Sequence, residues 1–333
     1  MKLEIQSPFD MHLHLRDGEI LRDVVNYTSS QFCGAVVMPN LNPPITSVKL
    51  ALEYKTRILN SSKYDFIPFV SLYLTEELDK EELQKAKDNG LFMLKLYPKG
   101  ATTGSENGVK EILSDKVLEI LEVAENLGFI LSIHGETNGF VLDREFEFLP
   151  IFESLAKTFP KLKIIFEHLS DRRSIELVER YDNLYATLTL HHMLLSLDDV
   201  LGGMLNPHYF CKPILKTPKD KETLLNIALN AHDKFSFGSD SAPHLISKKE
   251  CNNGAAGIFS APILLPKLAE VFEKHDSLEN LEKFVSLNAT KIYNLNRSNR
   301  KITLIKQELK VSKIYNDIVP LFAGDSMSWS LEQ

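Results

Sequence analysis

The stretch SDKVLEILEVAENLGFILSIH, residues 114–134, places a helix, a stop signal and a strand in immediate succession. Its apolar side chains first recur at helical spacing, at Val117, Leu118, Ile120, Leu121, Ala124 and Leu127. Ser114 suits the position that caps a helix N-terminus, and Gly128 suits the left-handed residue that ends a helix. The apolar run 129–134 then predicts a buried strand that ends in His134. The stretch therefore predicts a helix that leads directly into a strand of an α/β fold.

The same order of helix, stop and strand recurs along the chain. Further helices are expected at 76–89, 172–181 and 221–232. Strands are expected at 8–14, 34–38, 66–73, 91–96, 129–134, 163–168, 184–189 and 235–240. These strands are nearly continuous apolar runs, which is typical of parallel strands covered on both faces. Eight strands alternating with helices predict a (β/α)8 TIM-like barrel with its site at the C-terminal strand ends. An open doubly wound sheet is the alternative, but no glycine-rich phosphate loop follows the first strand.

Length and composition limit the class of protein. The chain has 333 residues, of which 44% are hydrophobic and 25% are charged, as in a globular protein with a sizeable core. A net charge of −7 argues against a nucleic-acid partner, and no apolar run approaches the ~20 residues of a membrane span. The N-terminus lacks the apolar region of a signal peptide, and the three cysteines show no paired spacing. We expect a cytoplasmic protein with one domain, 1–333, and a C-terminal appendage at about 305–333.

Residues of the types that bind metals lie at the predicted ends of five strands. His12 and His14 share one strand face, about 6–7 Å apart along the backbone, so both imidazoles can converge on one cation. Lys95 lies within an apolar strand, where a buried ammonium is costly unless it is paired or neutralised. The full set is His12, His14, Lys95, His134, His168 and Asp240. Their common placement predicts a metal site at the C-terminal end of the barrel.

Six short motifs carry a resemblance to a known family. They are HLHLRD at 12–17, MPN at 38–40, KLYP at 95–98, HGE at 134–136, EH at 167–168 and GSDSAPH at 238–244. Together they resemble the motifs of dihydroorotase, in the short bacterial class II type, within the amidohydrolase superfamily. The resemblance extends from residue 8 to the stretch 321–324.

The resemblance implies a centre with two Zn²⁺ ions per chain. One ion would be held by His12, His14 and Asp240, and the other by His134 and His168. Lys95 would bridge both ions as N6-carboxylysine, the carbamate formed from its amine and carbon dioxide. This modification makes physical sense, because an ammonium cannot remain beside two dications whereas a carbamate is an anionic oxygen ligand.

The resemblance also implies a reaction, namely the reversible interconversion of N-carbamoyl-L-aspartate and (S)-dihydroorotate plus water in de novo pyrimidine (UMP) biosynthesis. A metal-bound hydroxide would attack the cyclic amide, with Asp240 as the proton shuttle. The implied substrate contacts are Arg16, Asn40, Thr102, Thr103, Lys212, His244 and Ala256. Arg16 shares the strand face of His14, where its guanidinium can grip a carboxylate bidentately. The resemblance further implies a mobile loop at 100–105 and a homodimer.

Two alternatives remain open. Another cyclic amidase, similar to hydantoinase or dihydropyrimidinase, would share the metals without needing a carboxylate clamp of Arg16, Asn40 and His244. A catalytically inactive barrel acting as an assembly partner would have no reason to keep the ligand set. Lys212 departs from the pattern of a family relative, which has an apolar residue there. No role is assigned to a group of further histidines, and ordinary polar positions are expected for His191, His192, His208, His232 and His275.

Overall fold

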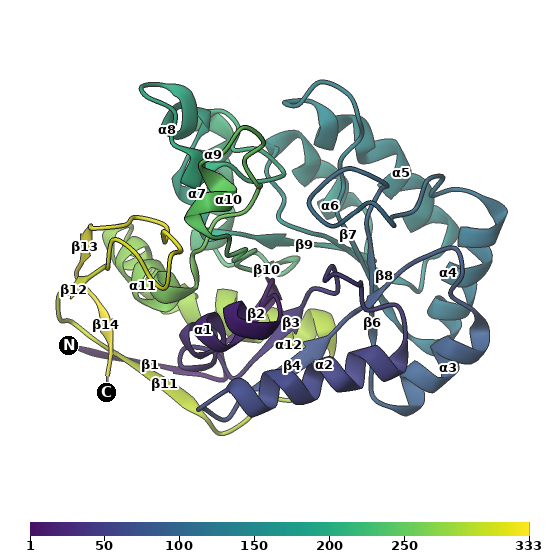
Figure 1. The fold of residues 1–333 in the computed structure, drawn as a ribbon, viewed down its shortest axis with the longest axis horizontal. Helices are drawn as coiled ribbons and strands as arrows, with labels where there is room; N and C mark the ends of the chain where they lie inside the picture. Colours follow the sequence, from purple (N-terminus) through teal and green to yellow (C-terminus); the bar gives the residue numbers. More distant parts are fainter. Residues whose placement is uncertain (333) are drawn as a thin grey trace.

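The computed structural model describes residues 1–332 and shows a ring of parallel strands wrapped by helices (Figure 1). The barrel strands are β2 (Phe9–Leu13), β3 (Gly34–Val37), β4 (Ile67–Val70), β5 (Leu72–Tyr73), β6 (Met93–Leu96), β7 (Ile130–Ile133), β8 (Lys163–Phe166), β9 (Leu184–Leu188) and β10 (Phe235–Phe237). Strands β2, β3 and β4 pair in this order in one parallel sheet, and strands β5 to β10 pair in sequence order in another. Only Ser71 separates β4 from β5, so the predicted strand 66–73 exists with one interruption. All eight predicted strands are confirmed.

Backbone hydrogen bonds close the ring between its first and last strands. The amide of Asp240, just after β10, donates to the carbonyl of His12 at 2.7 Å. The amide of His14 donates in turn to the carbonyl of Ser241 at 2.9 Å. These contacts complete the (β/α)8 barrel predicted from the sequence. They also place Asp240 beside the two histidines of β2.

Most of the helices lie on the outside of the ring (Figure 1). The longer ones are α1 (Gly18–Ser29), α2 (Val48–Ser61), α3 (Lys80–Asp88), α4 (Asp115–Leu127), α5 (Arg144–Thr158), α9 (Pro218–Leu229) and α11 (Leu264–Lys274). The shorter ones are α6 (Ile175–Arg180), α7 (Leu190–Leu194), α8 (Leu197–Leu201), α10 (Ile246–Lys249) and α12 (Asn288–Tyr293). Gly128 ends α4 with φ of 71°, as predicted. Ser114 does occupy the N-cap of α4, but its side chain makes no capping hydrogen bond among the described residues.

Capping side chains explain why two helices begin away from their predicted starts. The helix expected at 76–89 begins at Lys80, because the carboxylate of Asp79 accepts from the amide of Glu82 at 2.8 Å. The helix expected at 221–232 begins earlier, at Pro218, because Thr217 and Asp220 form a capping box. The segment expected at 172–181 divides into a 3₁₀ turn, Arg172–Ser174, and α6.

Apolar residues from opposite sides of the ring fill its interior. Strands β2 and β3 meet β6, β7 and β8 in one buried cluster, to which α12 also contributes. Its members are Phe9, Met11, Val36, Met38, Met93, Ile130, Ile165, Ala289, Ile292 and Tyr293. This packed core fills part of the ring, so the site formed by the polar strand ends lies above tightly packed apolar side chains and not above an open channel.

The two ends of the chain pair with each other, which the sequence did not indicate. Strand β1 (Lys2–Gln6) runs antiparallel to β11 (Lys301–Ile305), which also pairs with β14 (Ser330–Leu331). A second small pair joins β12 (Leu309–Lys310) to β13 (Ser326–Met327). The predicted appendage at 305–333 therefore begins with β11 and includes the N-terminus, while residue 333 lies outside the described residues. Within residues 1–332, no helix combines the length and apolarity needed to cross a membrane.

Trp329 anchors this terminal sheet to the barrel, and its truncation should destabilise the protein. Its side chain is fully buried, and its Nε1 donates to Oε2 of Glu273 on α11 at 2.9 Å. Trp329→Ala should lower the free energy of unfolding by about 3–5 kcal/mol, measured by denaturant titration. As a control, Phe140→Ala removes a side chain that is 64% exposed and should change stability by less than about 0.5 kcal/mol. Equal effects of the two substitutions would contradict this packing.

Candidate metal centre and active site

One pocket at the C-terminal strand ends brings together nearly all the predicted site residues. Its lining comprises His12, His14, Arg16, Asn40, Tyr97, Thr102, Thr103, His134, His168, Lys212, Asp240, Ala242, Ala256 and Gly257. The two predicted residues outside this lining adjoin it. Lys95 Nζ lies 4.9 Å from the centre of the Tyr97 ring, and His244 Nε2 lies 2.9 Å from Nη2 of Arg16.

Three residues of the pocket adopt the left-handed backbone region directly after their strands. The φ angles are 57° at Arg16, 42° at His168 and 44° at Asp240. This conformation is uncommon for residues other than glycine and tends to persist where function requires it. All three carry side chains that the sequence assigned to the metals or the substrate.

The first predicted ligand group is assembled in the structure. The ligand atoms of His12, His14 and Asp240 all lie within 4.8 Å of one another. Oδ1 of Asp240 is 3.1 Å from Nε2 of His14 and 3.5 Å from Nε2 of His12. The opposite nitrogens are already occupied, since Nδ1 of His12 contacts Glu167 at 2.8 Å and Nδ1 of His14 contacts Asn40 at 2.8 Å. Both rings are thus oriented with Nε2 toward the position of one cation.

The second predicted pair is arranged in the same way. Nδ1 of His134 lies 3.2 Å from Nε2 of His168, close to the ~3.3 Å that two nitrogens span when they bind one zinc at 2.0–2.1 Å in tetrahedral geometry. Nε2 of His134 contacts Oε2 of Glu136 at 2.7 Å, which fixes its ring. Burial holds the pKa of His168 well below its ordinary value, so the ring is neutral and its lone pair can bind a metal.

Lys95 lies near both groups and, within residues 1–332, has no counter-ion in direct contact. Its side chain is fully buried, and Nζ makes no hydrogen bond to any residue in 1–332. Burial lowers the Lys95 pKa to about 8, against the opposing attraction of Glu167 and Asp240. The lysine charge adds to burial in lowering the pKa of His12, His14 and His168, so it acts on members of both groups. An orphaned amine with a lowered pKa suits reaction with carbon dioxide, because the neutral amine is the nucleophile.

Glu167 and Tyr97 are buried in the site and, like Glu136, had no role assigned from the sequence. Glu167 accepts hydrogen bonds from Ser132 and from Thr187 (2.6 Å) in addition to its contact with His12. Tyr97 lines the pocket beside Lys95, and its hydroxyl has no partner within the described chain. The sequence signal for Glu167 was an acidic residue at the end of a buried strand, which needs partners to be tolerated.

The predicted substrate contacts lie on the outer side of the pocket. Arg16 Nε donates to the carbonyl of Pro243 at 3.2 Å, and His244 Nε2 also lies 3.0 Å from the carbonyl of Ala256. Burial lowers the pKa of His244 to about 3, reinforced by the charge of Arg16, so His244 is neutral. Arg16 therefore provides positive charge here without an acidic partner in hydrogen-bonding contact among residues 1–332.

The loop 100–105 is tied to the same pocket by two hydrogen bonds. Nδ2 of Asn40 donates to the carbonyl of Thr103 at 3.0 Å, and Nζ of Lys212 donates to the carbonyl of Ala101 at 3.0 Å. Asn40, predicted as a substrate contact, therefore joins His14 to the loop in this structure. Thr102 and Thr103 lie in the pocket wall, as their assignment requires.

The comparisons with known proteins agree with this arrangement. The family model described as amidohydrolase matches residues 63–295. A dihydroorotase of Helicobacter hepaticus is 56% identical over 99% of this chain and 98% of its own length. The chain belongs to the dihydroorotase family of amidohydrolases. The family predicted from the six motifs is confirmed, and with it the prediction of a hydrolase enzyme.

Solved structures of the family share this fold closely. A dihydroorotase from Campylobacter jejuni superposes with a TM-score of 0.95 at 44% identity, covering 100% of this chain and 98% of its own. One from Saccharomyces cerevisiae, in complex with 5-fluoroorotic acid, has a TM-score of 0.93 at 33% identity, covering 99% of this chain and 98% of its own. An L-hydantoinase of Arthrobacter aurescens superposes with a TM-score of 0.83 at only 17% identity, covering 99% of this chain and 83% of its own. At this low identity the likeness shows a common fold and nothing more.

The buried contact between Glu167 and His12 should strengthen metal binding. Glu167→Gln keeps the shape of the side chain but removes the charge that orients the His12 ring, so zinc affinity should fall by about 10- to 100-fold. Competition with a chromophoric chelator measures this change. The control is Glu250→Gln, which alters a comparable contact with His208 (2.8 Å) in which the glutamate is exposed. If both variants bound zinc as the wild type does, Glu167 would have no part in the centre.

Proposed function

We propose that this pocket interconverts N-carbamoyl-L-aspartate and (S)-dihydroorotate, with water as the other reactant, in pyrimidine biosynthesis. The observation that carries the proposal is the convergence, in one pocket, of two groups of metal-ligand atoms around Lys95 with the guanidinium of Arg16. Membership of the dihydroorotase family supports the same reaction. The proposed substrate is therefore a small anionic molecule.

The residues present fit a binuclear zinc centre. We assign His12, His14 and Asp240 to one ion, His134 and His168 to the other, and carboxylated Lys95 to both. When bound, such ions polarise a carbonyl oxygen and lower the pKa of a water molecule from 15.7 to about 7. The orphaned Nζ of Lys95 and the facing nitrogens of His134 and His168 support this assignment.

Asp240 is the proposed proton carrier. Burial raises its pKa above the usual range, which makes the carboxylate a better base than one in water. During ring opening Asp240 takes a proton from the attacking water and delivers it to the ring nitrogen that departs. During ring closure it takes the proton from the carbamoyl nitrogen and passes it to the departing carboxylate oxygen, and a second proton taken up from solvent completes the water molecule. Its backbone hydrogen bond to His12 holds it in position for both directions.

Arg16, with neutral His244 beside it, is proposed to hold the substrate carboxylate. Asn40, Thr102 and Thr103 face the same pocket, and backbone groups of Lys212 and Ala256 are proposed to contact the ring. The relative from Saccharomyces cerevisiae is in complex with 5-fluoroorotic acid, an acid with a carboxylate on a pyrimidine ring. A hydantoinase-like activity would leave the Arg16 guanidinium without a partner. An inactive assembly partner would leave the whole ligand set without a use.

We further propose that residues 1–333 form one hydrolase domain that acts in the cytoplasm as a homodimer. The pairing of β1 with β11 supports a single domain, because it ties the two ends of the chain together. The family resemblance supports the dimer and the location. Light scattering coupled to size-exclusion chromatography tests the dimer directly.

Arg16→Met tests the feature that distinguishes the proposed function from that of related enzymes, namely a substrate with a carboxylate. Removing the guanidinium breaks a charge pair with the substrate carboxylate, which should cost about 2–5 kcal/mol in kcat/KM. This corresponds to a loss of roughly thirty- to several-thousand-fold on dihydroorotate, followed by ultraviolet absorbance. Zinc content should not change, since Arg16 is not a ligand.

Two controls make the Arg16 experiment specific. Arg57→Met removes a surface guanidinium that pairs with Asp17, and it should leave turnover unchanged. Dihydrouracil lacks the carboxylate, so it should be a poor substrate that is nearly indifferent to Arg16→Met. Dihydroorotate turnover equal to that of the wild type would refute the carboxylate assignment and favour a hydantoinase-like activity.

A further inference from the structure

We propose that His191, His192 and Cys211 form a third cation site, beside the binuclear centre, that takes a zinc-like transition metal ion. The three side chains come from two separate segments that follow β9. His191 and His192 lie on the short helix α7, and Cys211 lies in the segment that leads to Lys212. None of the three belongs to the ligand set assigned above.

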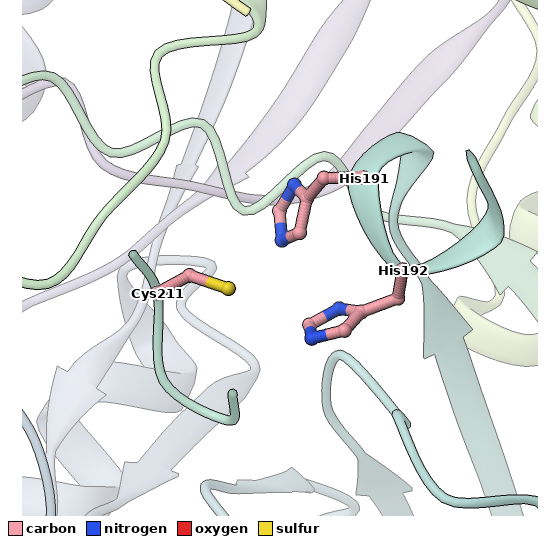
Figure 2. A group of neighbouring side chains, drawn as sticks. All are labelled: His191, His192 and Cys211. Carbon is pink, nitrogen blue, oxygen red and sulfur yellow. The ribbon is translucent and has the colours of Figure 1, made fainter. Parts of the chain in front are cut away.

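The geometry brings three donor atoms to one point. The ligand atoms of His191, His192 and Cys211 lie within 4.8 Å of one another, and all three side chains are buried. Figure 2 shows the sulfur of Cys211 pointing toward the two imidazole rings. The ring centres are 4.6 Å apart. A tetrahedral zinc ion with bonds of about 2.0–2.3 Å spaces its ligands by roughly 3.3–3.8 Å, so a small inward movement suffices.

The imidazole ring of His191 is buried without a hydrogen-bond partner among the described residues. It is completely buried, and neither Nδ1 nor Nε2 has a hydrogen-bond partner anywhere in residues 1–332. An unsatisfied buried polar group is costly, and native proteins seldom tolerate one without a bound water or ion. Burial also holds the pKa of His191 well below its ordinary value, so the ring is neutral and only one of its two nitrogens carries a proton. The ring therefore offers a lone pair to a cation.

The other two proposed ligands, Cys211 and His192, make hydrogen-bond contacts with neighbouring residues. Sγ of Cys211 and Nε2 of His192 both lie near the carbonyl of Pro213, at 3.2 and 3.0 Å, and Nδ1 of His192 lies 2.9 Å from Oγ1 of Thr189. Because Nε2 of His192 faces a carbonyl, it carries the proton, and Nδ1 keeps its lone pair. Binding of the cation displaces the Cys211 thiol proton to solvent, so the thiolate becomes the anionic ligand.

The ligand types select the class of ion. Two imidazoles and one thiolate suit zinc and its neighbours and do not suit magnesium or calcium, which prefer oxygen. Three protein ligands leave the fourth tetrahedral position for water. The assigned binuclear centre, by contrast, uses only nitrogen and oxygen ligands. This difference gives the two sites separate spectroscopic signatures.

The position of the site suggests what the ion would do. Helix α7 directly follows strand β9, whereas Cys211 immediately precedes Lys212, which lines the pocket and holds the loop 100–105 through Ala101. A cation bound by both segments would fasten the Lys212 segment to the barrel. The ion is therefore inferred to support the substrate side of the pocket through the Lys212 segment.

Cobalt substitution tests the proposal without relying on activity. The metal-free wild-type chain is reconstituted with Co²⁺, and its absorbance is recorded in the near ultraviolet, where a thiolate bound to Co²⁺ gives an intense charge-transfer band. The wild type should show this band, and Cys211→Ser and His191→Gln should lose it. The controls Cys33→Ser and Cys251→Ser alter the other two cysteines and should keep it.

Elemental analysis after zinc loading gives a second readout. The wild type should hold about one more zinc ion per chain than Cys211→Ser, with the rest retained by the binuclear centre. Absence of the band from the wild-type spectrum refutes the site even if a variant fails to fold. A cobalt-loaded wild type without a thiolate band, or a band that Cys33→Ser or Cys251→Ser removes, would overturn the proposal.

Discussion

The amine of Lys95 lies out of water at the end of a packed strand, and the site is organised by the need to compensate it. Around it, burial keeps the rings of His12, His14 and His168 neutral, and Nδ1 of His134 lies 3.2 Å from Nε2 of His168. Two nitrogens at that distance can share one proton or bind one cation. The proposed pair of metal ions and the carbamate on Lys95 would compensate the amine and occupy these nitrogens together, because each ion would pair with the new anion and with the neutral rings.

The barrel supplies the positions that this chemistry needs. Closure of the ring between β2 and β10 relies on the amide of Asp240 and the carbonyl of His12, so one backbone contact joins two residues proposed to bind the same ion. The packed interior prevents the ligands from sinking into the ring, and Glu167, Glu136 and Asn40 fix the outer nitrogens of their histidines. The fold and the site therefore share the same hydrogen bonds, and a barrel that closed differently would not assemble the first ligand group.

Much of this was readable in the sequence, because parallel strands carry long apolar runs and their ends share one edge. That rule found all eight strands and placed the six ligand-type residues together. It did not find β1 pairing with β11, because a five-residue strand with a single buried residue has no local signature and its partner lies about 300 residues away. Tyr97 and the His191–Cys211 cluster were also missed, since their meaning depends on which buried atoms lack partners. Only three-dimensional contacts reveal that.

Diffraction at the zinc absorption edge, from crystals of the zinc-loaded protein, tests the proposed binuclear centre most directly. Two anomalous peaks are expected in the pocket, one beside His12, His14 and Asp240 and the other beside His134 and His168. Electron density is also expected to continue beyond Nζ of Lys95 as a carbamate between the two peaks. A single peak in the pocket, or a Lys95 side chain that ends at a free amine in active protein, would contradict it.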